Sequence, residues 1–399
     1  MKPIVSELQR YIDKHFKGPY DKICKTLRFS TVQTRFLNDL HSMMMNAHLE
    51  WFNQSHTITQ SAEISKPKRE NYHYIPEEFR RVIENDLKPH QEFRFTVGQR
   101  KISVTFYADA QKSFQAKKWA LYLQKIYIWL TVADKFASAK CAKSLHLFIY
   151  LTPLLKTMPE SHEMIDRKHA NTAFTTSCTE TTEIHLYREE EWLKVCIHET
   201  FHSLGLDFST MESSVYAKQM QVLYGLHHDV RLYESYAEIW AEMINTCMVV
   251  HYSMIYTKKN TGFVEQVRRA LCYEITFSMI QCTKILQHYD LVYDDLLNQP
   301  ALIYEQYQEQ TPVFSYYIVK PVLLFYIGDF IEWTMIHNRG SFDFLKTKAN
   351  VDSYIQFLQQ HRTKSEYRSL MYSIHTLYQT VKNTRLTGSK TMRMTLFED

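Results

Sequence analysis

The sequence predicts an α+β protein in which a small β-rich region lies between two mostly helical regions. Alternating apolar and polar residues mark short segments between residues 92 and 187, and most other apolar residues recur at helical spacing. Glycine is scarce, with 8 residues in 399, which favours long helices over tight hairpins. We expect a helical N-terminal region over residues 1–90, an α+β region over 91–211 and a helical region over 212–399.

The N-terminal region is expected to be helical over residues 1–58, because Leu37, Leu40, Met44 and Trp51 recur at helical spacing. Residues 59–90 are polar and contain three prolines, so they read as a connecting segment around one short helix, Glu77–Asp86.

The central region carries the strand signals. Two alternating segments flank Gly98-Gln99-Arg100 and predict a β-hairpin. A nearly continuous apolar run predicts a buried strand, and a later segment alternates again. The expected order is strand 92–97, strand 101–107, helix 110–138, strand 145–151, strand 182–187 and helix 189–204, with Glu189-Glu190-Glu191 in the first turn of the last helix and Gly205 ending it.

The C-terminal region is expected to be almost entirely helical. The apolar stretch from Pro312 to Ile336 is interrupted by charged residues and proline, which favours a buried helix over a membrane span. Residues 383–399 are polar and read as a tail. The expected helices are 212–225, 229–256, 262–297, 313–337, 342–360 and 363–382.

Charge and cysteine content limit the setting of the protein. A net charge of +4 without a basic stripe argues against nucleic-acid binding, and the densest basic run, Lys66-Pro67-Lys68-Arg69, reads as a solvated linker. Seven cysteines, an odd number without a Cys-X-X-Cys pair, predict that all are reduced, as in the cytoplasm. The first residues lack the apolar core of a signal peptide.

The strongest functional signal is the segment His198-Glu199-Thr200-Phe201-His202, an instance of the HExxH motif. Positions i and i+4 share one face of a helix, so His198 and His202 can bind one metal ion. Glu199 follows the first ligand and is suited to act as general base on a water molecule at the open metal position.

The motif and the order of the elements before it resemble the zincin metallopeptidases over about residues 91–245. In that superfamily a small twisted sheet backed by a helix precedes the HExxH helix. The sequence of residues 192–208 also resembles that of uncharacterised metallopeptidases that large DNA viruses encode. The resemblance implies a zincin-like catalytic unit, a zinc ion and a peptide or protein substrate.

A third metal ligand is needed, because a catalytic zinc site takes three protein ligands. The metzincin pattern fails, since its third-ligand position holds Phe208. Residues 232–242 resemble the second glutamate helix of the gluzincins, which implies Glu234 as the ligand and Glu238 as a supporting acid. Asp207 is expected to accept a hydrogen bond from a ligand imidazole; its alternative is a turn residue.

A donor for the developing oxyanion is also expected, and the candidates are Tyr316, Tyr317, His227 and His228. The expected function is a zinc-dependent peptidase, although the same ligands also suit iron or manganese. Two alternatives stay open. One is a structural or interaction protein, such as a virion component, that keeps the fold, and the other is a metal-dependent hydrolase of a non-peptide substrate. A protein partner, such as another component of a virion in which the chain is packaged, is a further expectation.

Overall fold

The computed structural model describes residues 3–54, 58–61, 64–109, 116–161, 163–257, 262–384 and 386–398. The chain forms two compact units, each built from separate stretches. Unit 1 comprises Met1–Asn38, Lys156–Ala170 and Met211–Asp399, and unit 2 comprises Asp39–Leu155 and Asn171–Thr210. The sheet unit therefore ends at Thr210, while residues 1–38 belong to the helical unit and residues 39–90 to the sheet unit.

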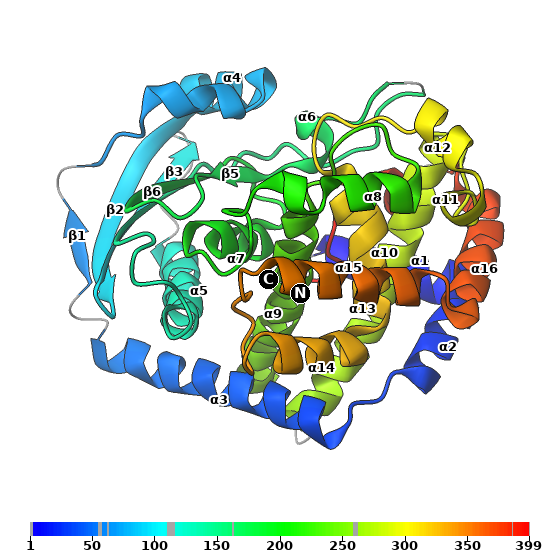
Figure 1. Ribbon diagram of the computed structural model, residues 1–399. Helices are drawn as coiled ribbons and strands as arrows, with labels where there is room; N and C mark the ends of the chain where they lie inside the picture. The colour runs from blue at the N-terminus through cyan, green and yellow to red at the C-terminus, as the bar shows by residue number, and fades with distance from the viewer. Residues whose placement is uncertain are drawn as a thin grey trace. The chain divides into compact units, whose positions relative to one another are not determined.

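Unit 2 contains a six-stranded mixed sheet, which makes the fold α+β (Figure 1). The strand order is β1-β2-β3-β4-β6-β5, with β3, β4 and β6 parallel and the other pairs antiparallel. The expected hairpin is confirmed, and Gly98 turns it with φ +56°. The strands are β1 (Thr59–Ser61), β2 (Leu87–Val97), β3 (Arg100–Asp109), β4 (Ser144–Ile149), β5 (Ala173–Thr175) and β6 (Thr181–Leu186). β1 and β5 are additions to the expected set, since three residues are too few to show alternation.

Helix α5 (Ala116–Asp134) packs on one face of the sheet. Its Trp119 ring lies 4.4 Å from Phe106 of β3, measured between ring centroids, and its Tyr127 ring lies 5.7 Å from Phe95 of β2. The expected helix 110–138 thus ends earlier, at Asp134, and residues 110–115 lie outside the described part of the chain.

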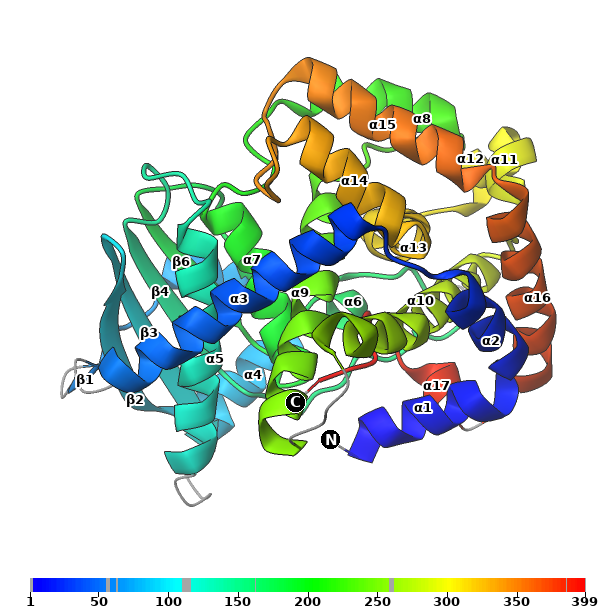
Figure 2. The same ribbon diagram turned by 90° about the horizontal axis from the view of Figure 1, so that it is seen from below.

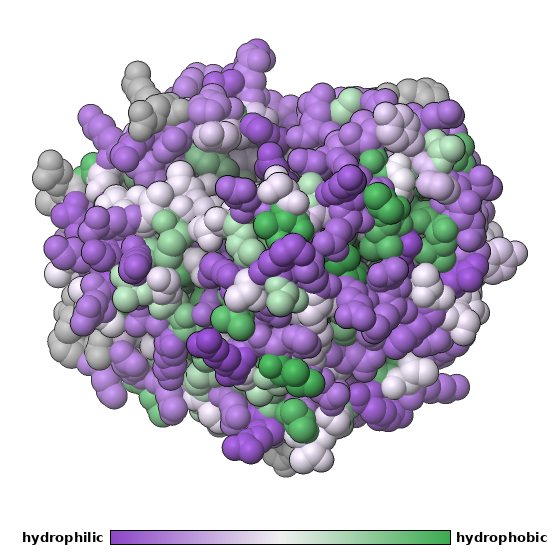
Figure 3. Space-filling model, viewed as in Figure 1, coloured by the Kyte–Doolittle hydropathy of each residue, from purple (hydrophilic) through white to green (hydrophobic). Residues whose placement is uncertain are grey.

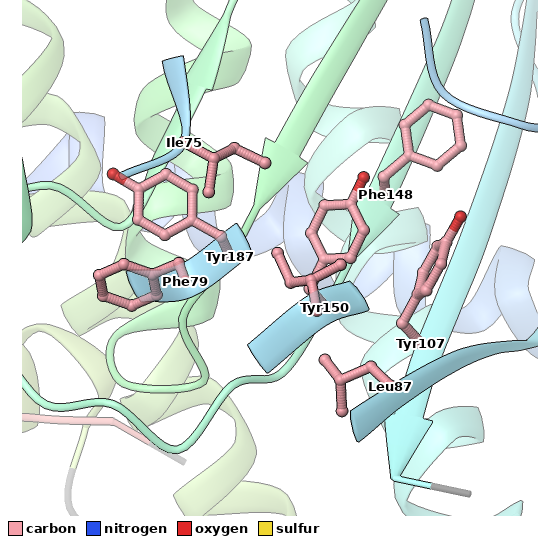
Figure 4. Packing of buried hydrophobic residues seen from close by; sticks show 8 residues of the cluster. Ile75, Phe79, Leu87, Tyr107, Phe148, Tyr150 and Tyr187 are labelled. Atoms are coloured by element: carbon pink, nitrogen blue, oxygen red, sulfur yellow. The ribbon is translucent and has the colours of Figure 1, made fainter. Parts of the chain in front are cut away.

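Helix α4 (Glu77–Asp86) has the expected bounds and covers part of the other face of the sheet. Phe79 and Ile83 of this helix belong to a buried cluster with Tyr107 of β3, Phe148 of β4 and Tyr150 just after β4, which Figure 4 shows from close by. The short helix η2 (Arg69–Tyr74) precedes it. The polar connecting segment therefore supplies one wall of a core, because its apolar residues are spaced for a single helical face.

Unit 1 is helical and centres on α9 (Leu232–Thr257) and α10 (Phe263–His288), which pack together. Helices α2 (Lys17–Thr26) and α16 (Ser365–Val381) pack on α10 (Figure 2). Further helices of this unit are α1 (Pro3–His15), α6 (Arg167–Ala170), η3 (Ser213–Val215), α8 (Ala217–Tyr224), α11 (Asp295–Asn298), α12 (Pro300–Gln306) and α15 (Lys348–Arg362). Helix α3 (Thr31–Gln54) begins in unit 1 and continues into unit 2.

The helix expected over 313–337 is broken into a π-helical turn (Phe314–Val319), α13 (Lys320–Phe325) and α14 (Ile327–His337). Pro321 lies in the first turn of α13, where its missing N–H is tolerated. The chain bends by 91° between Phe325 and Ile327. Among the described helices, none taken singly has the length and apolar composition to cross a bilayer. The segments Phe314–Phe325 and Ile327–His337, taken together, are the one bent pair of described helices that meets those criteria.

The expected C-terminal tail is wrong. After α17 (Thr387–Lys390), residues 391–397 are buried in unit 1, with Met392 and Leu396 fully inaccessible. Glu274 of α10 accepts hydrogen bonds from the backbone N–H groups of Leu396 and Phe397 at 2.7 and 2.8 Å. The segment appears polar in sequence because every second residue is polar, but buried partners satisfy those groups.

Hydrophilic residues predominate on the face of the molecule drawn in Figure 3, where hydrophobic residues form small separate groups.

Candidate metal centre

Helix α7 (Trp192–Ser203) carries the HExxH motif in its last two turns, as expected. All twelve residues are buried, and the helix is held by α5, where Trp129 Nε1 donates a hydrogen bond to Thr200 Oγ1 at 2.6 Å. The expected acidic first turn is wrong: the three glutamates precede the helix, and Glu191 occupies the N-cap position with φ +61°. Because the backbone turns sharply at Glu191, the helix begins at Trp192, later than the run of three glutamates suggested.

The two histidines of the motif converge on one point. The Nε2 atoms of His198 and His202 lie 3.1 Å apart, and both side chains are buried. Two nitrogens bound to a tetrahedral zinc ion at about 2.0–2.1 Å each lie roughly 3.3 Å apart. The separation in unit 2 therefore fits two ligands of a single ion without a change of rotamer.

Asp207 holds the imidazole of His202. One carboxylate oxygen, Oδ2, is paired with His202 Nδ1, and the other, Oδ1, accepts hydrogen bonds from Ser209 N at 3.0 Å and Ser209 Oγ at 2.7 Å. A carboxylate at Nδ1 leaves Nε2 unprotonated and able to bind a metal ion. The contact that the sequence interpretation requires is therefore present.

Gly205 ends α7 with φ +68°, as expected. Its N–H donates to His202 O at 3.1 Å, and Leu206 N donates to Phe201 O at 2.8 Å. A Cβ atom at Gly205 would lie 2.8 Å from Cys141 Sγ, so both the backbone angle and the space require glycine here.

The expectation that all seven cysteines are reduced is wrong, because Cys141 and Cys178 form a disulfide. Each cysteine precedes its strand by three residues, and Ser144 of β4 pairs with Thr181 of β6 in the parallel register. Because the two cysteines have equal offsets from adjacent parallel strands, they lie side by side. The sequence reveals this proximity only once the pairing of β4 with β6 is known. The five other cysteines are free thiols.

The disulfide also lies against the end of α7, since Cys178 N donates to His202 O at 3.1 Å.

Glu199 is buried, with 7% of its surface exposed. Burial, together with the nearby Glu199 carboxylate, raises the pKa of the Cys196 thiol to about 12. Cys196 therefore stays protonated at neutral pH.

In unit 1, Glu234 lies in the first turn of α9 and is 7% exposed. The Tyr316 hydroxyl donates a hydrogen bond to Glu234 Oε2 at 2.9 Å. The structure thus brings together two residues that the sequence nominated for separate roles.

Glu238, one turn further along α9, belongs to a buried ionic cluster. Lys320 Nζ lies 3.9 Å from Glu238 Oε1 and 3.2 Å from Glu242 Oε2, and it donates to Met394 O at 2.7 Å. Burial alone would lower the pKa of Lys320, but the carboxylates of Glu242, Glu238 and Glu274 raise it above its ordinary value. Glu238 therefore has a cation of its own within unit 1. Lys320 was not singled out by sequence, where it reads as an interruption of an apolar run.

The other oxyanion candidates have different surroundings in unit 1. The Tyr317 hydroxyl donates to Met392 O at 2.6 Å, which makes it a satisfied core tyrosine. His228 Nε2 lies 3.2 Å from Glu309 Oε1, and His227 is exposed beside Tyr304. Of the four, Tyr316 is the candidate that contacts a predicted metal ligand.

Comparisons of the chain with protein families, curated proteins and solved structures found no match in any of the three. The geometry of the chain's own residues therefore carries the functional proposal.

Proposed function

We propose that the chain is a zinc-dependent peptidase in which His198, His202 and Glu234 bind the metal ion. The observation that carries the proposal is the convergence of the two imidazole Nε2 atoms on buried α7, 3.1 Å apart. Asp207 on the other side of the His202 ring supports it, because such carboxylates fix the tautomer of ligand histidines.

The donor set fits zinc. Each of the three residues offers one ligand atom, an imidazole nitrogen or a carboxylate oxygen, and all three are buried. Two histidines and one carboxylate leave one coordination position for water or substrate, as catalytic zinc sites require. The pairing of Glu234 with the two histidines is part of the proposal.

The order of elements supports a zincin-like unit. The hairpin β2–β3, helix α5, strand β4, strand β6 and helix α7 come in the order that the resemblance implies, with α6 and β5 inserted between β4 and β6. Helix α5 backs the sheet and holds α7 through Trp129.

Zinc, when bound, would supply a Lewis acid for the scissile carbonyl and lower the pKa of a bound water. Glu199 follows His198 directly, and its carboxylate would take a proton from the attacking water and pass it to the leaving amine. Tyr316 would hold Glu234 in its ligand rotamer through the 2.9 Å hydrogen bond. Asp207 would orient His202.

The test combines metal content with cleavage of an unbiased peptide library. The wild-type chain should bind one zinc ion and cleave peptides, whereas Glu199→Gln should keep the metal and the fold but lose turnover, because the base is not a ligand. Elemental analysis and circular dichroism check metal and fold in the same preparations.

Four outcomes would reject the proposal or part of it. Equal cleavage by wild type and Glu199→Gln would exclude this mechanism. Bound zinc with hydrolysis of esters or other non-peptide bonds alone would favour the hydrolase alternative, and absence of both metal and cleavage would favour a structural protein. Iron or manganese in place of zinc would change the cofactor but keep the ligand set.

A further inference from the structure

A second polar site lies in unit 2, on the face of the sheet opposite α5. Phe95 and Phe106 point towards α5, so the alternating residues of β2 and β3 point to the other face. On that face Arg94 of β2 pairs in register with Ser103 of β3, which pairs with His146 of β4. Three polar side chains thus form one row across three strands.

This row forms part of a cavity of about 490 Å³, within the size range of small-molecule sites. Its walls come from β1 to β4 and from Ser65. Two cationic residues, Arg94 and Lys101, line it together with His146 and five serine or threonine residues, and no carboxylate is among its described lining residues. The lining therefore favours an anionic ligand.

Glu92 holds the guanidinium of Arg94 in position. It is fully buried and its Oε1 atom lies 2.5 Å from Arg94 Nε, while its carboxylate also accepts hydrogen bonds from the backbone and the hydroxyl of Ser65. Burial alone would raise the pKa of Glu92, but these bonds from Ser65 and Arg94 hold it below its ordinary value. Glu92 is thus ionised at neutral pH and orients the half-exposed guanidinium of Arg94.

Ser103 and His146 supply a hydrogen-bond donor in either tautomer. Ser103 Oγ lies 2.7 Å from His146 Nδ1. A neutral imidazole and a hydroxyl carry one hydrogen each, and the bond between them uses one. The other hydrogen remains on Nε2 if serine donates, or on the hydroxyl if histidine donates. Burial lowers the pKa of His146, so the neutral ring is the form present at pH 7.

We propose that this cavity binds a small molecule that carries a phosphate monoester, with the phosphate between Arg94, Lys101 and the Ser103–His146 pair. A guanidinium matches phosphate with paired N–H donors, and lysine adds a point charge. The cavity is larger than a phosphate ion, which leaves room for an organic group. The site lies on the opposite side of the sheet from α5, so it does not depend on the proposed metal centre.

Titration with phenyl phosphate, followed by calorimetry, tests the site. Measurements in EDTA on the His198→Ala chain remove any phosphate bound through a metal ion. Saturable binding is expected, and Lys101→Gln should weaken it by about tenfold, as loss of a charge-assisted hydrogen bond implies. The matched control is Lys143→Gln, an exposed lysine at the same end of the sheet that pairs with Glu180 and does not line the cavity.

The same titration can overturn the proposal. Binding that is unchanged in Lys101→Gln, or weakened equally by Lys143→Gln, would show that the phosphate contacts other surfaces. Phenol binding as tightly as phenyl phosphate would show that the cavity takes the ring and not the anion. No saturable binding of phenyl phosphate at millimolar concentration would also reject the site. Retention of binding in Ser103→Ala together with loss in Lys101→Gln would keep the anion site and remove the Ser103–His146 pair from it.

Discussion

Tyr316 OH donates a hydrogen bond to Glu234 Oε2 at 2.9 Å, although the two residues are 82 positions apart in the sequence. The bond lies entirely within unit 1, where the π-helical turn carries Tyr316 beside the first turn of α9. A donor at this oxygen restricts the rotamer of the carboxylate. Tyr316 is therefore suited to orient Glu234, the proposed metal ligand, in addition to the role as oxyanion donor that the sequence suggests.

Replacing Tyr316 by phenylalanine should weaken zinc binding or activity by about 10–100-fold, the usual effect of losing a residue that orients a ligand. The measurement is zinc affinity by competition with a chromogenic chelator, alongside peptide turnover. Tyr317→Phe is the matched control, because it removes a hydroxyl that donates to Met392 O instead. It should cost about 1 kcal/mol of unfolding free energy and leave zinc affinity unchanged. Equal zinc affinities in both variants would contradict the role of Tyr316.

Glu234→Ala and Glu238→Gln should separate the ligand from its neighbour. Glu234→Ala is expected to abolish the rise in melting temperature that added zinc produces, because metal bound only to the folded state is what raises it. Glu238→Gln should keep that rise, since Glu238 has Lys320 as its partner in unit 1. A thermal shift titration measures both. The reverse result would assign Glu238 as the ligand, and an unchanged response in both variants would place the third ligand elsewhere.

Removing the disulfide with Cys141→Ser and Cys178→Ser together should lower the unfolding free energy by about 2–4 kcal/mol, since the bridge spans 37 residues. A reducing agent should lower the melting temperature of the wild-type chain but not that of the double variant. Thiol titration of the unfolded chain should find five reactive groups before reduction and seven after it. Seven groups before reduction would show that the bridge does not form.

Lys284 should make stability depend on pH in the alkaline range. Its amine is buried and donates to Gly388 O at 2.8 Å and Thr391 O at 2.6 Å, and burial lowers its pKa to about 7. Between pH 7 and the ordinary value near 10.4, the unfolded chain binds a proton that the folded chain does not. This group therefore raises the unfolding free energy as pH rises, by at most about 1.4 kcal/mol per pH unit, and the contribution is lost as pH falls towards 7.

Lys284→Met should flatten that dependence, which urea unfolding between pH 7.5 and 9.5 measures. Lys382→Met, which changes an exposed lysine of the same unit, is the control and should keep the slope of the wild type. An equal slope in wild type and Lys284→Met would mean that the Lys284 amine keeps its proton in the folded chain.

Local patterns predicted the elements whose residues signal their own structure. The bounds of α4 agree because Pro76 precedes a run with one apolar face, and the hairpin agrees because Gly98 supplies the positive φ that its turn requires. The HExxH spacing alone places His198 and His202 on one face of α7.

The features that the sequence did not reveal depend on tertiary pairing. The disulfide requires β4 and β6 to be neighbours, and the contact between Tyr316 and Glu234 requires the helices of unit 1 to pack. The C-terminal segment reads as polar because Arg393 and Thr395 are polar. Glu398 and Glu274 satisfy them inside the unit. Burial of polar groups with their partners has no local signature.

Unit 1 joins segments that are far apart in the sequence: Tyr11 of α1 contacts Ser389 and packs against Gly388, both of which lie in α17. During synthesis, α1 leaves the ribosome well before α17, which packs against it. All of unit 2 is available once residue 210 has emerged. Unit 2 can therefore fold while the rest of unit 1 is synthesised, whereas α1 must wait for α17. A chain that stalls before residue 391 would leave Glu274 and Lys320 without the backbone partners that they have in the folded unit.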